Sequence, residues 1–77
     1  MKKLLNTLFV LTPDSYLSLK NENVQIHSED GTVKMFPLIG LESIFCFSYK
    51  GASPELIEKC VQNGISITFL TPDGVYL

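Results

Sequence analysis

The chain has 77 residues and a formal net charge of −2, with eight acidic residues against six basic ones. Hydrophobic residues make up 45% of it and charged residues only 18%, which excludes a disordered tail, and the length allows one domain. All six basic residues are lysine. A stand-alone nucleic-acid-binding protein normally has a positively charged surface with arginines that contact phosphates and guanines. The composition therefore indicates a small globular domain that acts as part of something larger.

The cysteines and the N-terminal sequence indicate the cellular compartment. Cys46 and Cys60 are too few for the disulfide framework of small secreted proteins, and their spacing matches no zinc or redox motif. The chain opens with lysines and an apolar run over 4–11, but Asn6 and Thr7 interrupt the run and no small-residue cleavage site follows. No apolar stretch reaches the twenty or so residues that a membrane helix needs. We therefore expect a cytoplasmic protein with reduced thiols and no membrane partner.

The first half of the chain alternates between short apolar segments and turn sequences, which predicts antiparallel hairpins. The turns are expected at Thr12-Pro13-Asp14-Ser15, Asn21-Glu22-Asn23 and Glu29-Asp30-Gly31. Pro37 ends the last strand of this half because proline has no N–H to donate to a sheet. The strands predicted here are residues 4–11, 16–20, 24–28 and 32–36.

The second half predicts a strand, a helix and a parallel strand. Residues 44–47 are apolar without alternation, so we expect this strand to be covered on both faces. Ser53 and Pro54 are typical of a helix start, and Asn63-Gly64 is typical of a helix end, which places the single helix at 54–62. Its core-facing residues are expected to be Leu56, Ile57, Cys60 and Val61.

Strands are expected again at 65–70 and, after the turn Thr71-Pro72-Asp73-Gly74, at 75–77. A helix between two strands of one sheet requires those strands to be parallel. The predicted fold class is therefore α+β, mostly β, with antiparallel hairpins and one strand-helix-strand unit. The apolar ending Val75-Tyr76-Leu77 and the run 44–47 also lead us to expect self-association, and to expect that the chain is the front piece of a longer protein.

No catalytic template is complete in the sequence. His27, the only histidine, is expected to be an exposed strand residue on the face opposite Val24 and Ile26, without a carboxylate partner. Glu42 is expected to pair with a lysine or to mark the entry to a strand. The acids of the turns are expected to form local hydrogen bonds, and these are Asp14, Asp30 and Asp73.

The remaining residue types also favour structural roles. The two cysteines are expected to be inert core thiols near one another, since no basic neighbour would lower a thiol pKa. The glycines match neither a phosphate loop nor a dinucleotide fingerprint. Tyr49-Lys50 is the only hint of the aromatic and basic pairing that stacks on nucleic acid. The sequence therefore predicts no catalytic, cofactor-binding or metal-binding residue.

Four blocks occur in the chain in a fixed order. They are Leu5-Asn6-Thr7-Leu8-Phe9-Val10 with Thr12-Pro13-Asp14-Ser15-Tyr16-Leu17; Pro37-Leu38 with Leu41-Glu42-Ser43-Ile44; Gly51-Ala52-Ser53-Pro54-Glu55-Leu56; and Gly64-Ile65-Ser66 with Phe69-Leu70-Thr71-Pro72-Asp73-Gly74. In this order and at these separations they resemble the opening of the CRISPR-associated integrase family of spacer acquisition, the first-numbered Cas protein, in its subtype I-C form. The resemblance covers essentially the whole chain.

The resemblance implies a parent protein with two parts. Residues 1–77 would be its N-terminal β-rich dimerisation domain, and a helical domain outside this range would bind Mg²⁺ or Mn²⁺ through a glutamate, a histidine and another acidic residue. The parent would form a homodimer through the β domain. With a small second Cas protein it would capture double-stranded DNA and join it to the CRISPR array. In some members a tyrosine of this domain wedges against the DNA end; Tyr16 is the nearest residue here, and we do not assign it that role.

Two other functions remain open at this point. The chain would be a stand-alone β-rich adaptor if its exposed edge accepted a strand from an unrelated partner. It would be an intact metal nuclease if subunits together supplied the missing ligands.

Overall fold

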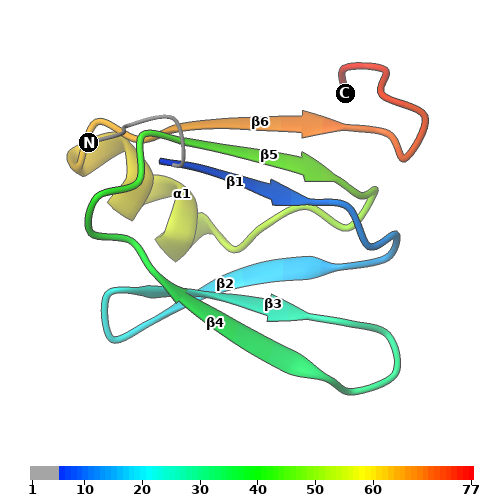
Figure 1. Ribbon diagram of the computed structural model, residues 1–77, viewed down its shortest axis with the longest axis horizontal. Helices are drawn as coiled ribbons and strands as arrows, with labels where there is room; N and C mark the ends of the chain where they lie inside the picture. The colour runs from blue at the N-terminus through cyan, green and yellow to red at the C-terminus, as the bar shows by residue number, and fades with distance from the viewer. Residues whose placement is uncertain (1–5) are drawn as a thin grey trace.

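The computed structural model describes residues 6–77. They form two three-stranded sheets and one helix (Figure 1). Sheet A contains the parallel strands β1 (Thr7–Val10), β5 (Ser43–Phe47) and β6 (Ser66–Leu70) in the order β1-β5-β6. Sheet B contains the antiparallel strands β2 (Tyr16–Lys20), β3 (Asn23–His27) and β4 (Val33–Pro37) in sequence order. Helix α1 (Pro54–Gln62) connects β5 to β6. The predicted fold class is confirmed.

Sheet B is built from two tight turns. Asn21 and Glu22 have φ values of 50° and 67°, so the β2–β3 turn has two residues in the left-handed region, as a type I′ hairpin requires. Asn23, which we expected in this turn, is instead the first residue of β3 and pairs with Lys20. The second turn uses Gly31 at a φ of 92°, and the N–H of Gly31 donates to the carbonyl of Ser28 over 3.0 Å. Local sequence therefore determines the whole of sheet B.

The helix starts and ends where the sequence predicted. The Oγ of Ser53 accepts a hydrogen bond of 3.2 Å from the N–H of Leu56, which satisfies one of the free amides of the first turn. At the other end Gly64 has a φ of 68°, and Ile65 donates to the carbonyl of Cys60 over 2.8 Å. This is the glycine-dependent Schellman end, and it directs the chain into β6 beside β5.

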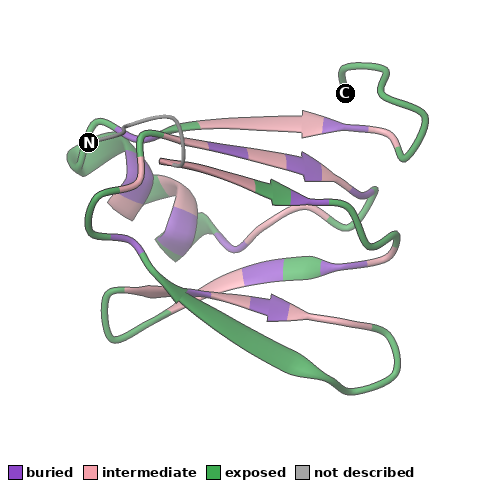
Figure 2. Cartoon of the chain, viewed as in Figure 1, coloured by how far each residue is buried: buried purple, intermediate pink, exposed green. Residues whose placement is uncertain are grey.

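One hydrophobic core lies between the two sheets and the helix. Each layer contributes side chains that are fully buried, and Figure 2 shows buried segments on strands of both sheets and on α1. Sheet B provides Leu17 and Val24, sheet A provides Ile44 and Cys46, and α1 provides Leu56 and Cys60. Because all three layers share this core, the described residues form one packed unit.

The Thr12–Ser15 turn ends β1 and leads into β2, as predicted, but the two strands lie in different sheets, because β1 pairs with β5. Two predictions about local packing were wrong. The run 44–47 does alternate, since Ile44 and Cys46 are buried while Phe45 and Phe47 are only partly buried. Val61 does not face the core, because it lies past the edge of the buried stripe on α1 and 72% of it is exposed.

The predicted strands at the two ends are also changed. The described part of the first strand is Thr7–Val10, and Leu4 and Leu5 lie outside the described residues. Residues 75–77 do not form a regular strand, and only an isolated bridge joins Tyr76 to Leu70. Two backbone hydrogen bonds flank this bridge, from the N–H of Thr71 to the carbonyl of Val75 over 2.7 Å and from the N–H of Leu77 to the carbonyl of Phe69 over 3.1 Å.

Candidate interaction surfaces

The outer face of sheet A carries aromatic side chains. Phe9 of β1 and Phe45 of β5 are direct neighbours in the sheet, and their rings stack with centroids 5.5 Å apart and planes 13° apart. Phe9 is 57% exposed, and Phe47 continues the same face one pair further along β5. Parallel sheets are normally covered on both faces. Here α1 and sheet B cover the inner face, so the aromatic outer face is a candidate docking surface.

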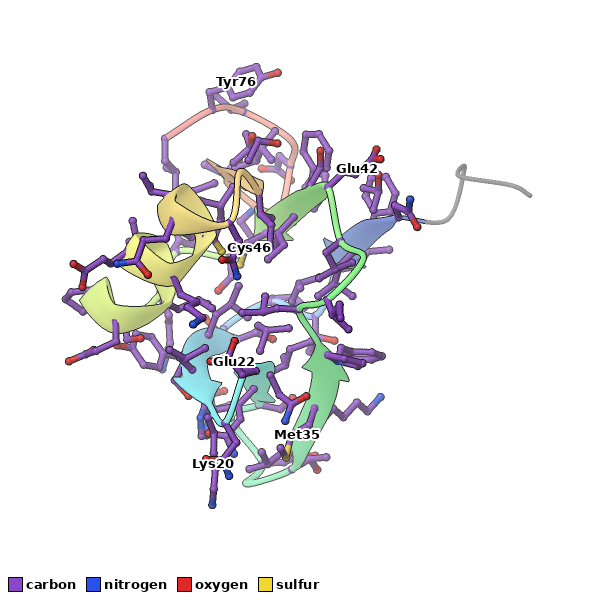
Figure 3. All side chains as sticks on the ribbon, turned by 90° about the vertical axis from the view of Figure 1, so that its left-hand side faces the viewer. Lys20, Glu22, Met35, Glu42, Cys46 and Tyr76 are labelled. Atoms are coloured by element: carbon purple, nitrogen blue, oxygen red, sulfur yellow. The ribbon has the colours of Figure 1, made fainter. Side chains whose placement is uncertain are left out.

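The C-terminal segment lies against the edge of sheet A. The N–H of Leu77 donates to the carbonyl of Phe69 over 3.1 Å, and the N–H of Val75 donates to the Oγ1 of Thr71 over 3.1 Å. The side chains of Val75, Tyr76 and Leu77 are nevertheless more than half exposed. In Figure 3 Tyr76 projects from one end of the molecule while Lys20 lies at the opposite end. The segment therefore extends the apolar surface of sheet A beyond β6.

The outer face of sheet B is mostly polar. The strand register aligns three rows across it: Tyr16, His27 and Val33; Ser18, Gln25 and Met35; and Lys20, Asn23 and Pro37. The Oγ of Ser18 lies 2.7 Å from the Nε2 of His27 and donates to the Oε1 of Gln25 over 3.2 Å. Within residues 6–77 the partner of His27 is thus a hydroxyl. The predicted placement of His27 on the face opposite Val24 and Ile26 is confirmed, but the residue is half-buried rather than exposed. A hydroxyl and an imidazole without a carboxylate are an incomplete catalytic set.

Strand β4 forms the free edge of sheet B. All five of its residues are exposed, which Figure 2 shows as a continuous exposed strand. Val33 and Met35 are each 47% exposed although both are large and apolar. Immediately after β4, Ile39 is 89% exposed beside a cavity of about 650 Å³. That cavity is lined by Glu22, Asn23, Pro37, Leu38, Ile39, Gly40, Leu41, Asn63 and Ile65.

Of the three turn aspartates predicted to form local hydrogen bonds, Asp30 is the one that does so among residues 6–77. Asp30 accepts a hydrogen bond of 2.9 Å from the N–H of Thr32, which lowers the pKa of the Asp30 carboxyl and confirms the local role predicted for it. At the two Thr-Pro-Asp turns the corresponding bonds are made by Ser15 and Thr71 rather than by the aspartates. Asp14 instead takes a positive φ of 62°.

Glu42 marks the start of β5, as predicted. Its N–H donates to the carbonyl of Asn6 over 2.8 Å, and its own carbonyl accepts from Ser66 over 3.0 Å, so its backbone connects all three strands of sheet A. The other predicted role, pairing with a lysine, is not seen among residues 6–77. The ion pairs found there join Lys59 to Glu22 at 2.8 Å and Lys50 to Glu29 at 4.0 Å.

Both cysteines are free thiols in the core. Burial raises the pKa of the Cys46 thiol to about 11 and also raises the pKa of Cys60. A thiol with a raised pKa is a poor nucleophile, so neither cysteine is suited to covalent catalysis. Residues 6–77 also bring no three His, Cys, Asp or Glu side chains together as a metal would require. No helix within residues 6–77 is long and apolar enough to cross a membrane.

The architecture and the sequence both match one known family. The family model described as CRISPR associated protein Cas1 matches residues 8–77. This chain belongs to the Cas1 family. The relative named CRISPR-associated endonuclease Cas1 1 from Chlorobaculum tepidum is 46% identical over 77 residues, which is all of this chain and 22% of the relative. The relative of the same name from Moorella thermoacetica is 36% identical over 74 residues, or 96% of this chain and 22% of the relative.

Solved Cas1 structures have the same fold. A CAS1 protein from Thermotoga maritima superposes with a TM-score of 0.77 at 21% identity, over 92% of this chain and 22% of that one. The structure titled TtCas1-DNA complex superposes with a TM-score of 0.65 at 17% identity, over 82% of this chain and 22% of that one. This chain therefore spans about a fifth of the Cas1 proteins it matches, and the family resemblance predicted from the sequence blocks is confirmed.

Sequence reasoning missed the surfaces that distinguish the two sheets. It took 44–47 as buried on both faces, although Ser43 at its start already suggested an outward face shared with Phe45 and Phe47. It also assigned no role to Met35, because an exposed methionine is recognisable only once the neighbours of its strand are known. Ile39 did have a local signal, since an apolar residue between Pro37 and Gly40 sits at the tip of a connection.

Proposed function

We propose that this chain is the N-terminal scaffold and dimerisation domain of a Cas1 integrase, the protein that inserts foreign DNA fragments into a CRISPR array. The supporting observation is that the family match extends through nearly the whole chain while covering only 22% of a Cas1 relative. In this role the domain joins two subunits and positions the remainder of each. It performs no chemistry of its own.

The surfaces described above are consistent with this role. A scaffold needs apolar area to join other chains, and the stacked Phe9 and Phe45 with the exposed residues 75–77 supply it beside an otherwise closed core. The neighbour crystallised with DNA is a Cas1 protein that superposes on 82% of this chain, which supports DNA as a ligand of the assembled parent. We propose that this DNA is double-stranded, as the family resemblance implies. The remaining partner in this proposal is a small second Cas protein, and the compartment is the cytoplasm.

We propose that the metal of the parent, Mg²⁺ or Mn²⁺, is bound outside this domain. Within residues 6–77 no three His, Cys, Asp or Glu side chains lie together. We assign metal binding to the remainder of the parent and derive no catalytic step from this chain. The competing function is a stand-alone β-rich adaptor, in which an exposed sheet edge accepts a strand from an unrelated partner. Unlike the Cas1 scaffold, such an adaptor requires no continuation of the gene.

Three measurements test the proposal. The gene is expected to continue beyond codon 77 into a helical region containing glutamate, histidine and an acidic residue, and a stop at codon 78 would favour the adaptor.

Analytical ultracentrifugation of the 77-residue chain should show a concentration-dependent dimer, and a strict monomer at high concentration would contradict dimerisation. Incubation with branched DNA and Mn²⁺ should give no cleavage, whereas cleavage that EDTA abolishes would contradict a purely scaffolding role.

A further inference from the structure

Asn63 and Gly64 form an Asn-Gly pair at the C-terminal end of α1, and both residues are exposed. The side-chain amide of an asparagine can be attacked by the backbone nitrogen of the next residue, and a glycine leaves that nitrogen unobstructed because it has no Cβ. The other asparagines all precede residues that have side chains; they are Asn6 before Thr7, Asn21 before Glu22 and Asn23 before Val24. Asn63 is therefore the asparagine that the sequence makes most susceptible to this attack.

The reaction at Asn63 would need no reagent other than water. The backbone nitrogen of Gly64 loses its proton and forms a bond to the Cγ of Asn63. The bond from Cγ to Nδ2 breaks, Nδ2 takes up a proton and leaves as ammonia, and a five-membered succinimide ring remains. Water then breaks one of the two ring bonds to nitrogen. Cleavage at Cγ gives aspartate, and cleavage at the backbone carbonyl carbon gives isoaspartate.

The folded end of α1 holds the reacting atoms apart. Ring closure requires the nitrogen of Gly64 to lie on the same side of the Cα–C bond of Asn63 as Cβ does. Asn63 has a ψ of 7°, so the Gly64 nitrogen eclipses the Asn63 nitrogen instead and is turned away from Cβ. The N–H of Gly64 also donates to the carbonyl of Val61 over 3.2 Å. Rotation into the reactive geometry would break this bond and the 2.8 Å bond from Ile65 to Cys60.

We propose that Asn63 is a self-modification site controlled by the C-terminal cap of α1. While the cap is closed, Asn63 is protected. When the cap opens, the succinimide forms and hydrolyses to aspartate and isoaspartate, and isoaspartate keeps the cap from closing again. The inference goes beyond the proposed scaffold function, because it concerns the covalent chemistry of the chain itself and does not depend on dimerisation or on DNA.

The packing around the cap explains why modification would hold it open. In isoaspartate the main chain runs through Cβ and Cγ, so an extra carbon separates α1 from Ile65 and displaces the hydrogen bond from Ile65 to Cys60 that ends the helix. Both products also place a carboxylate at the C-terminal end of a helix, where the helix dipole disfavours negative charge. Asn63 lines the same cavity as Glu22, so the new charge would face an existing carboxylate. Aspartate adds only the charge, whereas isoaspartate adds the charge and alters the main chain.

The first test compares the folded chain with the unfolded chain. Samples are kept at pH 8 in buffer or in guanidinium chloride, then digested and analysed by chromatography and mass spectrometry, which detect the loss of ammonia and separate aspartate from isoaspartate. In denaturant, modification should be fastest at Asn63, and the other three asparagines are internal controls. In buffer the rate at Asn63 should fall about tenfold or more, because only molecules with an open cap react.

Two results of this first test would overturn the proposal. Equal rates in buffer and in denaturant would show that the cap does not control the reaction. Faster modification at Asn6, Asn21 or Asn23 in denaturant would show that Asn63 is not the preferred site. Asn63→Ser removes the reactive amide, so its digest should show no ammonia loss from the peptide that contains position 63.

The second test measures what the product does to the fold. The isoaspartate form is purified from the denatured sample, refolded and compared with Asn63→Asp, which has the same charge and an unaltered main chain. Urea unfolding followed by circular dichroism should show a lower midpoint for the isoaspartate form than for Asn63→Asp. Equal midpoints would show that isoaspartate still allows the cap to close, and this would overturn the proposed effect on the cap.

Discussion

The two sheets share one core but differ on their outer surfaces. Sheet A is parallel, and its outer face carries the stacked Phe9 and Phe45. Sheet B is antiparallel, and its outer face carries the Ser18, Gln25 and His27 network beside an exposed edge strand. Both inner faces contribute buried apolar side chains to the shared core, so the difference lies in what the two sheets present outward. Sheet A presents an apolar face for covering, whereas sheet B presents an edge for extension.

The largest expected effect is the loss of stability when a core side chain is removed, and its measurement tests whether the two sheets share one core. Ile44→Ala in sheet A and Leu17→Ala in sheet B each remove a fully buried side chain, and each should lower the free energy of unfolding by about 2–5 kcal/mol. The outer-face controls should cost less, with Phe45→Ala near 1 kcal/mol and Gln25→Ala within about 0.5 kcal/mol.

Urea unfolding followed by circular dichroism measures these four variants. Both core variants should unfold in a single transition, because neither sheet has a core of its own. Two separate transitions, or a large loss for one core variant alone, would show that the sheets are stabilised independently.

The second expected effect concerns Cys46, which lies in the core on sheet A. Its folded-state pKa of about 11 lies above its ordinary value of 9.0, so the unfolded chain loses this proton first as pH rises. The stabilisation is complete below pH 9 and is lost between about pH 9 and pH 11, reaching about 1 kcal/mol of loss at pH 10. Urea unfolding at pH 7, 8 and 10 should show this decrease, and Cys46→Ala should reduce it.

Cys46 on sheet A and Cys60 on α1 both lie in the core that the two sheets share, so their thiols report on the opening of this core. Ellman's reagent at pH 8 should label neither thiol in the folded chain and both in urea. Labelling that is much faster than global unfolding would show that part of the core opens without unfolding of the whole domain.

The contrast between the sheets also explains what sequence could and could not predict. Sheet B follows from turns at Asn21-Glu22 and Gly31, and the unit β5-α1-β6 follows from Ser53, Pro54 and Gly64, because each of these signals is local. The one-residue error at Asn23 arose because Asn21 and Glu22 together complete a two-residue turn. Local chemistry therefore located most elements to within a residue or two.

The pairing of β1 with β5 was not predictable in this way. Thr7 pairs with Ser43, far along the chain, and nothing in the local sequence of either strand specifies the other. The same limit applies to the candidate surfaces, since Phe9, Phe45 and Met35 gain significance only from their neighbours on adjacent strands. The family could still be predicted because it depends on the order of sequence blocks rather than on contacts.

The smallest expected effect concerns the contact between the β2–β3 turn and helix α1. Glu22 has a φ of 67°, which is unfavourable for any residue except glycine by about 1 kcal/mol, and it also forms an exposed ion pair of 2.8 Å with Lys59. Such a pair contributes roughly 0.2–1 kcal/mol. Glu22→Gly should therefore leave stability unchanged or raise it by up to about 0.8 kcal/mol, because relief of backbone strain outweighs the lost pair.

Glu22→Gln separates the two contributions, since it keeps the strained backbone and removes only the charge. It should lower the free energy of unfolding by a few tenths of a kcal/mol at low salt, and this loss should disappear in 0.5 M NaCl because salt screens exposed pairs. If Glu22→Gly instead lowered the free energy of unfolding relative to the wild-type chain, the ion pair would outweigh the backbone strain. The turn and the helix would then be joined electrostatically as well as through the common core.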